Sequence, residues 1–176
     1  MHSQRPTTHD SLDWAVNETA EPEPDPLWDA VESATLRRLD TLYAEAVALA
    51  TDCMDALLQA REAHPYHARG SVGVRVRRSP SPRSAPGVFL IEWFRVRGQQ
   101  RTDYIARGSG HRYARRTFGR LEPWEWALIE TYEPRFAEIR LLLHQIGLLR
   151  RQARHLTVLL ERRERSDSGL EFELQD

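Results

Sequence analysis

Residues 72–106 read VGVRVRRSPSPRSAPGVFLIEWFRVRGQQRTDYIA, and their pattern predicts a small sheet in the centre of the chain. At its start, valine alternates with glycine or arginine, which is the two-residue period of a half-buried strand. A second strand is predicted over 88–97, where both faces are apolar, and a third over 101–106. A meander of three antiparallel strands is not stable by itself. Helices must therefore cover one of its faces.

The connection between the first two strands has a different composition. Residues 79–87 read SPSPRSAPG, and three prolines within nine residues prevent a strand. We therefore predict a mobile loop here.

Two long helical patterns flank the meander. From Pro26 to Ala63, apolar residues recur at alternating spacings of three and four, and no glycine or further proline interrupts them. A second helix is predicted over 123–165, with a kink or break near Thr131 caused by Pro134. We expect its heptad row to face the first helix of the same chain, although a homodimer through it stays open. This row consists of Ile139, Leu142, Ile146, Leu149, Ala153, Leu156 and Leu160.

These elements predict an α+β fold in which two long antiparallel helices, a helical hairpin, flank a small three-stranded antiparallel meander. A single domain is expected over 27–165. Residues 1–26 are acidic and rich in proline, so we expect a disordered N-terminal arm. Residues 166–176 are expected to form an acidic tail.

Positive charge is concentrated in the centre of the chain. Residues 65–121 hold thirteen arginines against Glu92 and Asp103, a net charge of +11, whereas 1–64 and 122–176 carry −9 and −3. The chain has no lysine, and its total formal charge is −1. Basic surfaces attract polyanions, of which nucleic acid is the commonest, and guanidinium groups bind phosphate in a bidentate manner. The alternative is a solvated arginine-rich surface without a partner.

The segment after the third strand, residues 107–120, reads RGSGHRYARRTFGR. Its arginines alternate with aromatic residues, and its first two glycines let the backbone approach a ligand closely. This composition predicts contacts with phosphates and bases, although the glycine spacing does not fit a dinucleotide fingerprint. The predicted DNA-binding residues of strands and loop are Arg75, Arg77, Arg78, Arg95, Arg97, Arg101, Arg107, Gly108, Gly110, His111, Arg112, Tyr113, Arg115, Arg116 and Arg120.

No catalytic residue, metal site or cofactor is predicted. Catalysis by a tyrosine nucleophile needs a metal cluster or an arranged set of basic groups, and the histidines other than His111, which lies near Tyr104 and Tyr113, are scattered. Cys53, the only cysteine, lies within a helical apolar pattern and should be buried. We find no signal peptide and no run of about 18 apolar residues. A bacterial, cytoplasmic protein without membrane contact is expected.

Several short motifs occur in a recognisable order between residues 88 and 140. This arrangement resembles the MobI type of conjugative mobilisation protein, which is found on integrative conjugative elements and large conjugative plasmids. The proline-rich loop at 79–86 departs from the pattern. The motifs are FLIEWF at 89–94, YI at 104–105, RGSGHRY at 107–113, WE at 124–125, and a helix with Glu130, Glu133 and Phe136.

The resemblance implies a non-catalytic auxiliary factor that acts with a relaxase at the origin of transfer. Combined with the basic centre, it predicts double-stranded DNA at that origin as the main partner and a relaxase as a further one. The alternative is a protein-interaction adaptor whose arginine-rich face docks an acidic protein partner.

Overall fold

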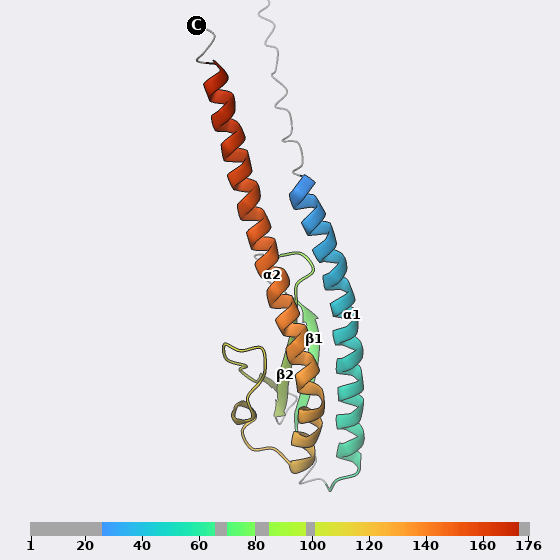
Figure 1. Ribbon diagram of the computed structural model, residues 1–176. Coiled ribbons are helices and arrows are strands. Elements are labelled where there is room, and N and C mark those ends of the chain that lie inside the picture. Colours follow the sequence, from blue (N-terminus) through green and yellow to red (C-terminus); the bar gives the residue numbers. More distant parts are fainter. Residues whose placement is uncertain (1–25, 66–69, 80–84, 98–100, 173–176) are drawn as a thin grey trace, which may run out of the picture.

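The computed structural model describes residues 26–65, 70–79, 85–97 and 101–172, with side chains up to residue 166. The predicted arm, except Pro26, and most of the predicted loop at 79–87 lie outside these residues. The chain forms two helices and a three-stranded antiparallel sheet, so the predicted α+β fold is confirmed (Figure 1). In chain order the elements are α1 (Pro26–Glu62), β1 (Val72–Arg78), β2 (Phe89–Arg97), β3 (Arg101–Tyr104), the 3-10 turn η2 (Arg115–Phe118) and α2 (Pro123–Phe172).

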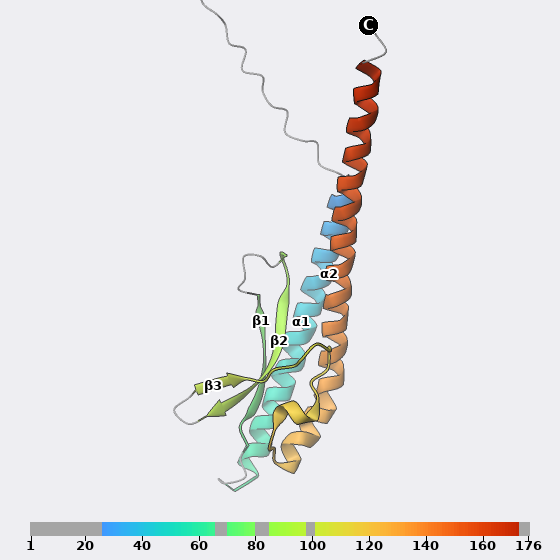
Figure 2. The same cartoon turned by 90° about the vertical axis from the view of Figure 1, so that its left-hand side faces the viewer.

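The sheet has the order β1-β2-β3, and β3 pairs only with residues 94–97 of β2. Val74 lies opposite Trp93, so the alternating side chains of both strands point to the same side. That side is buried against the helices, whereas every residue of β3 is exposed. The end of β2 and β3 form a ribbon that extends away from the helices (Figure 2). β3 ends at Tyr104, two residues before the predicted end of the third strand.

α1 and α2 run antiparallel, side by side, across the apolar face of the sheet (Figures 1 and 2). The predicted apolar row of α1 is buried from Leu39 to Leu57, and Cys53 lies within it. Each such leucine contributes about 1.5–3 kcal/mol through removal from water. The core is completed by large side chains from β2, η2 and α2, namely Phe89, Trp93, Phe118, Ile129 and Phe136.

Pro134 does not break α2, contrary to the sequence prediction. Its side chain is exposed, and so is Glu130. The backbone carbonyl group of Glu130 has no helical hydrogen-bond donor, because proline lacks the N–H group that would bind it. Water can hydrate that carbonyl, while Glu133 and Phe136 anchor the helix in the core on either side. α2 also continues to Phe172, seven residues beyond the predicted end.

The expectation that the whole heptad row of α2 faces α1 is wrong. Ile139 and Ala153 are buried, but Leu149, Leu156 and Leu160 are 42–49% exposed. A straight α-helix drifts by about 20° per heptad relative to a seven-residue repeat, so a long row turns away from its neighbour. α2 also extends past the beginning of α1 (Figure 2).

Glu125 joins the beginning of α2 to the beginning of β1. Its carboxylate accepts hydrogen bonds from the amides of Ser71 and Val72 at 2.8 and 3.0 Å, and from the Glu122 amide at 3.1 Å. Gly70 has φ +68°, and a Cβ atom there would meet the Glu125 side chain. Both ends of the basic centre are therefore held together. Among the described residues, neither helix combines the length and apolar character that crossing a membrane requires.

Candidate nucleic-acid interface

The outer face of the sheet carries arginines and aromatic rings. Side chains at alternate positions of β1 point away from the helices, which places Arg75 and Arg77 on this face. The Arg75 guanidinium lies 4.4 Å from the centroid of the Tyr104 ring. Arg77 forms a 2.7 Å ion pair with Glu92, and this hydrogen bond raises the pKa of the guanidinium. Of the two arginines, Arg75 therefore has its charge available to a ligand, because the charge of Arg77 is offset by Glu92.

Besides Arg77, three further predicted site arginines are engaged within the protein. Arg78 pairs with Asp40 at 3.2 Å, and Arg97 pairs with Asp103 across the β2-β3 ribbon. Arg95 donates hydrogen bonds to the backbone carbonyl groups of Phe118 and Arg120 and so holds the end of the loop. These contacts give the three side chains structural roles, so they are weaker candidates for phosphate contact.

The loop between β3 and α2 presents a group of accessible arginines. Gly108 has φ +86°, and no atom lies within 4 Å of the position where a Cβ would stand, so the backbone here is open to solvent. Arg115 stacks over Trp126 at 4.8 Å, which fixes its guanidinium. Within the described part of the chain, no acidic residue pairs with the exposed arginines of β3 and this loop, which are Arg101, Arg112, Arg116 and Arg120.

Tyr113 is a core residue, not a surface contact. It is 5% exposed, and burial raises the pKa of its phenol. Its amide donates a 2.7 Å hydrogen bond to Glu133, and the guanidinium of Arg140 lies 4.8 Å from its ring centroid. The alternation of arginines and aromatic residues therefore has a packing origin at this position.

A groove of about 700 Å³ runs between the loop, the edge of β2 and α2. Its basic lining includes Arg107, His111 and His144. The two imidazole rings lie 5.1 Å apart, and Arg140 donates a 2.9 Å hydrogen bond to the carbonyl group of His111. The Nε atom of Arg107 is buried without a hydrogen-bond partner among the described residues. The guanidinium of Arg107 also lines the groove, and its positive charge favours an anionic ligand there.

The motifs behind the resemblance meet around one side chain. Glu133 of α2 accepts a 2.6 Å hydrogen bond from the Trp93 indole of β2 and a hydrogen bond from the backbone amide of Tyr113 in the loop. Phe136 packs edge-on against Trp93. The family model described as MobI protein matches residues 42–154, more than half of the chain. The chain belongs to the MobI family. This membership assigns it to conjugative mobilisation. No curated protein and no solved structure matches the chain.

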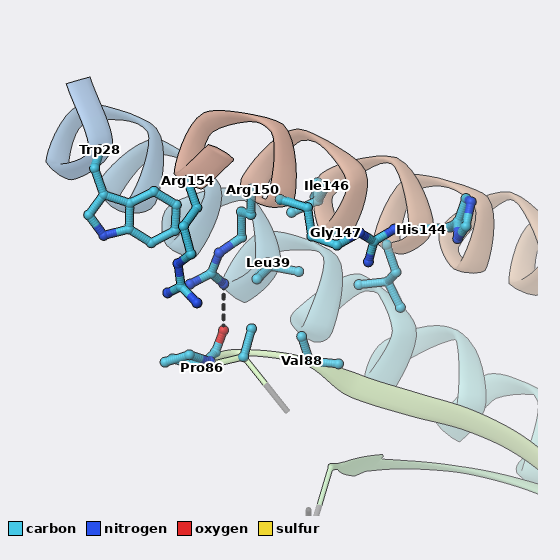
Figure 3. A pocket seen from close by; sticks show the side chains of 12 residues that line it. Trp28, Leu39, Pro86, Val88, His144, Ile146, Gly147, Arg150 and Arg154 are labelled. Atoms are coloured by element: carbon cyan, nitrogen blue, oxygen red, sulfur yellow. Dashed lines mark hydrogen bonds between the residues drawn. The ribbon is translucent and has the colours of Figure 1, made fainter. Parts of the chain in front are cut away.

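The MobI-family match ends at Arg154, which belongs to a second basic cluster that the sequence analysis missed. A cavity of about 600 Å³ lies between α1, α2 and residues 85–88 (Figure 3). Arg150 bridges Glu32 at 2.9 Å and the carbonyl group of Pro86 at 3.0 Å. Arg154 stacks over Trp28 at 4.8 Å, and Arg151 also lines the cavity.

His144 lines both the cavity and the groove, so the two basic surfaces of this MobI-family chain are adjacent. The signal in the sequence was the helical spacing of Arg140, His144, Arg151 and Arg154, which places them on one side of α2. Among the residues described, no three His, Cys, Asp or Glu side chains lie together as a metal site would require.

Proposed function

We propose that this chain is a non-catalytic DNA-binding auxiliary factor of conjugative transfer, which recognises the origin of transfer and assists a relaxase in the cytoplasm. The observation that carries the proposal is the group of exposed arginines on β3 and the following loop that lack acidic partners among the described residues. Like charges on one loop repel each other unless an anion offsets them. Phosphates of a duplex supply such anions in a regular row.

The groove supports the same assignment. Arg107 supplies a positive charge to the groove lining, and the imidazole N–H groups of His111 and His144 are further donors for phosphate. Arg112 and Arg116 of the same loop are exposed. We infer that the phosphate backbone crosses this groove and the loop, because backbone contacts are the commoner use of arginine.

The sheet supplies a second contact surface of a different kind. Tyr104 is exposed on its outer face with Arg75 stacked on it, and the Phe94 ring lies over Gly73. Such a combination suits an unpaired base at the edge of the site, because an aromatic face stacks on any base. The duplex would then be held through the loop and a neighbouring base through the sheet.

The alternative, an adaptor for an acidic protein, has one observation in its favour. Val96 and Tyr104 are both 44% exposed on the ribbon, and apolar groups beside arginines are common in protein interfaces. Binding of DNA by the purified chain alone distinguishes the two functions.

The test is a titration of labelled duplex with the purified full chain, measured by fluorescence anisotropy. One duplex carries the origin of transfer of the encoding element, and the other is a scrambled sequence of equal composition. If about six arginines meet phosphates, log affinity should fall with log salt at a slope of roughly −5. Origin DNA should bind more tightly than the scrambled duplex. A slope near zero, or no binding at low salt, would refute direct DNA recognition and favour the adaptor.

A further inference from the structure

One side of α2 carries an unusually long row of exposed apolar side chains. Five of them are more than 40% exposed, and they occur between residues 141 and 160. At 100° per residue they share one strip with Gln145, Leu148 and Gln152, and no charged residue falls within this strip between residues 141 and 160. The five are Leu141, Leu149, Leu156, Leu159 and Leu160.

The strip follows a heptad register that keeps Leu142, Leu149 and Leu156 of the row predicted to face α1 but combines them with other positions. One set of positions holds Leu142, Leu149 and Leu156, followed by Arg163. The other set holds Glu138, then Gln145, Gln152 and Leu159. The spacing alternates between three and four throughout, as in the contact line of a two-stranded coiled coil. The strip therefore begins with an acid and ends with a base, about 38 Å apart along the helix.

We propose that a second copy of this chain covers the strip, through antiparallel pairing of the two α2 helices about a two-fold axis between Leu149 and Gln152. An interface of this symmetry must be complementary to itself. In an antiparallel pair, each position of one set packs on a position of the other set. The resulting layers join Leu142 to Leu159, Gln145 to Leu156, Leu149 to Gln152, and Glu138 to Arg163, in each case of the opposite copy.

Charge decides the direction of the pairing. An antiparallel pair places Glu138 against Arg163 at both ends of the strip, which is favourable. A parallel pair would place Glu138 against its own copy and Arg163 against its own copy, which is unfavourable at both ends.

The proposed dimer is independent of the DNA-binding function. Arg151 and Arg154 lie roughly 140–160° around α2 from Leu156, on the side that lines the cavity shown in Figure 3. The groove at His144 is on the same side as these arginines. Both basic surfaces thus stay accessible in the dimer, and loss of one property need not change the other.

The oligomeric state of the full chain tests the proposal. Sedimentation velocity at about 1–100 μM should show a reversible dimer. The variant Leu149→Glu/Leu156→Glu should raise the dissociation constant of the dimer at least about tenfold, because two like charges enter the apolar layers. Val158→Glu is the matched control, since Val158 is 36% exposed on another side of the same helix. It should leave the dimer unchanged. A monomer throughout the concentration range would overturn the proposal.

Cross-linking tests the direction. One chain carries Glu138→Cys and the other Arg163→Cys, while Cys53 stays protected because it is fully buried. A mixture of the two chains should cross-link through these positions, and neither chain should cross-link to itself. Self-cross-linking would establish a parallel pair and contradict the proposal. If the chain without residues 1–25 dimerises and the full chain does not, that segment covers the strip instead, and the proposal is overturned.

Discussion

Glu133 and Arg140 form an ion pair in the interior of the protein, with side chains only 2% and 3% exposed and a shortest N–O distance of 2.9 Å. Burial lowers the pKa of the Arg140 guanidinium, and Glu133 opposes this effect. The two side chains also bind the Trp93 indole, the Tyr113 amide and the His111 carbonyl group. One buried pair on α2 thus fixes both the sheet and the basic loop.

Replacement of one partner should be costly. Glu133→Gln leaves the buried guanidinium without a counter-charge, so we expect a loss of about 3–5 kcal/mol in the free energy of unfolding. Chemical denaturation measures it. The double variant Glu133→Gln/Arg140→Met removes both charges and should recover part of the loss. An unchanged denaturation midpoint in the single variant would contradict a structural role for the pair.

The exposed arginines of the loop should affect DNA binding and not stability. For Arg112→Ala/Arg116→Ala we expect an unchanged melting temperature, weaker binding to every duplex, and a salt slope reduced by about two. The control is Arg37→Ala/Arg38→Ala, which removes the same charge from exposed positions of α1. If the control weakens binding equally, the effect comes from net charge and the loop is not the site.

Two neighbouring leucines of α1 test the placement of the core. Leu57 is 0% exposed and Leu58 is 48% exposed. Leu57→Ala should cost about 2–5 kcal/mol, whereas the same change at Leu58 should cost less than about 1 kcal/mol. Urea unfolding of the two variants provides the comparison. Equal losses of stability in the two variants would show that the apolar face of α1 is assigned incorrectly.

Cys53 should make stability depend on alkaline pH. Burial raises the pKa of its thiol from 9.0 to about 12, so the folded chain keeps a proton that the unfolded chain releases. Stability should therefore fall as pH rises above about 9. Cys53→Ala should lack this component of the loss. Thiol reagents should label the native protein slowly and the denatured protein fast, and rapid native labelling would contradict the burial.

Local periodicity was sufficient to predict most of the fold. The valine alternation from Val72 and the apolar row from Leu39 to Leu57 each determine which side of an element is buried. The concentration of arginine between two acidic flanks also pointed to one surface. These are features of neighbouring residues, which a sequence displays directly.

Features that depend on distant residues were not predictable in this way. Tyr113 is buried because Glu133 and Arg140, twenty or more positions away, bind its backbone and its ring. Pro134 fits a continuous helix because its exposed side can be hydrated. Arg95 turns inward because carbonyl groups of the loop end beside it. Each depends on a tertiary partner that local periodicity does not reveal.

The extension of α2 beyond α1 has a consequence for how proteins of this architecture can diverge. The part of α2 that extends beyond α1 can change length without repacking of the core. Insertion of seven residues after the apolar strip would move the C-terminus outward by about 10 Å and keep its orientation to within about 20°. Insertion of two residues would instead rotate everything beyond it by about 160°. Length variation among relatives should therefore occur in whole heptads wherever the C-terminus has a partner, and in any number of residues where it has none.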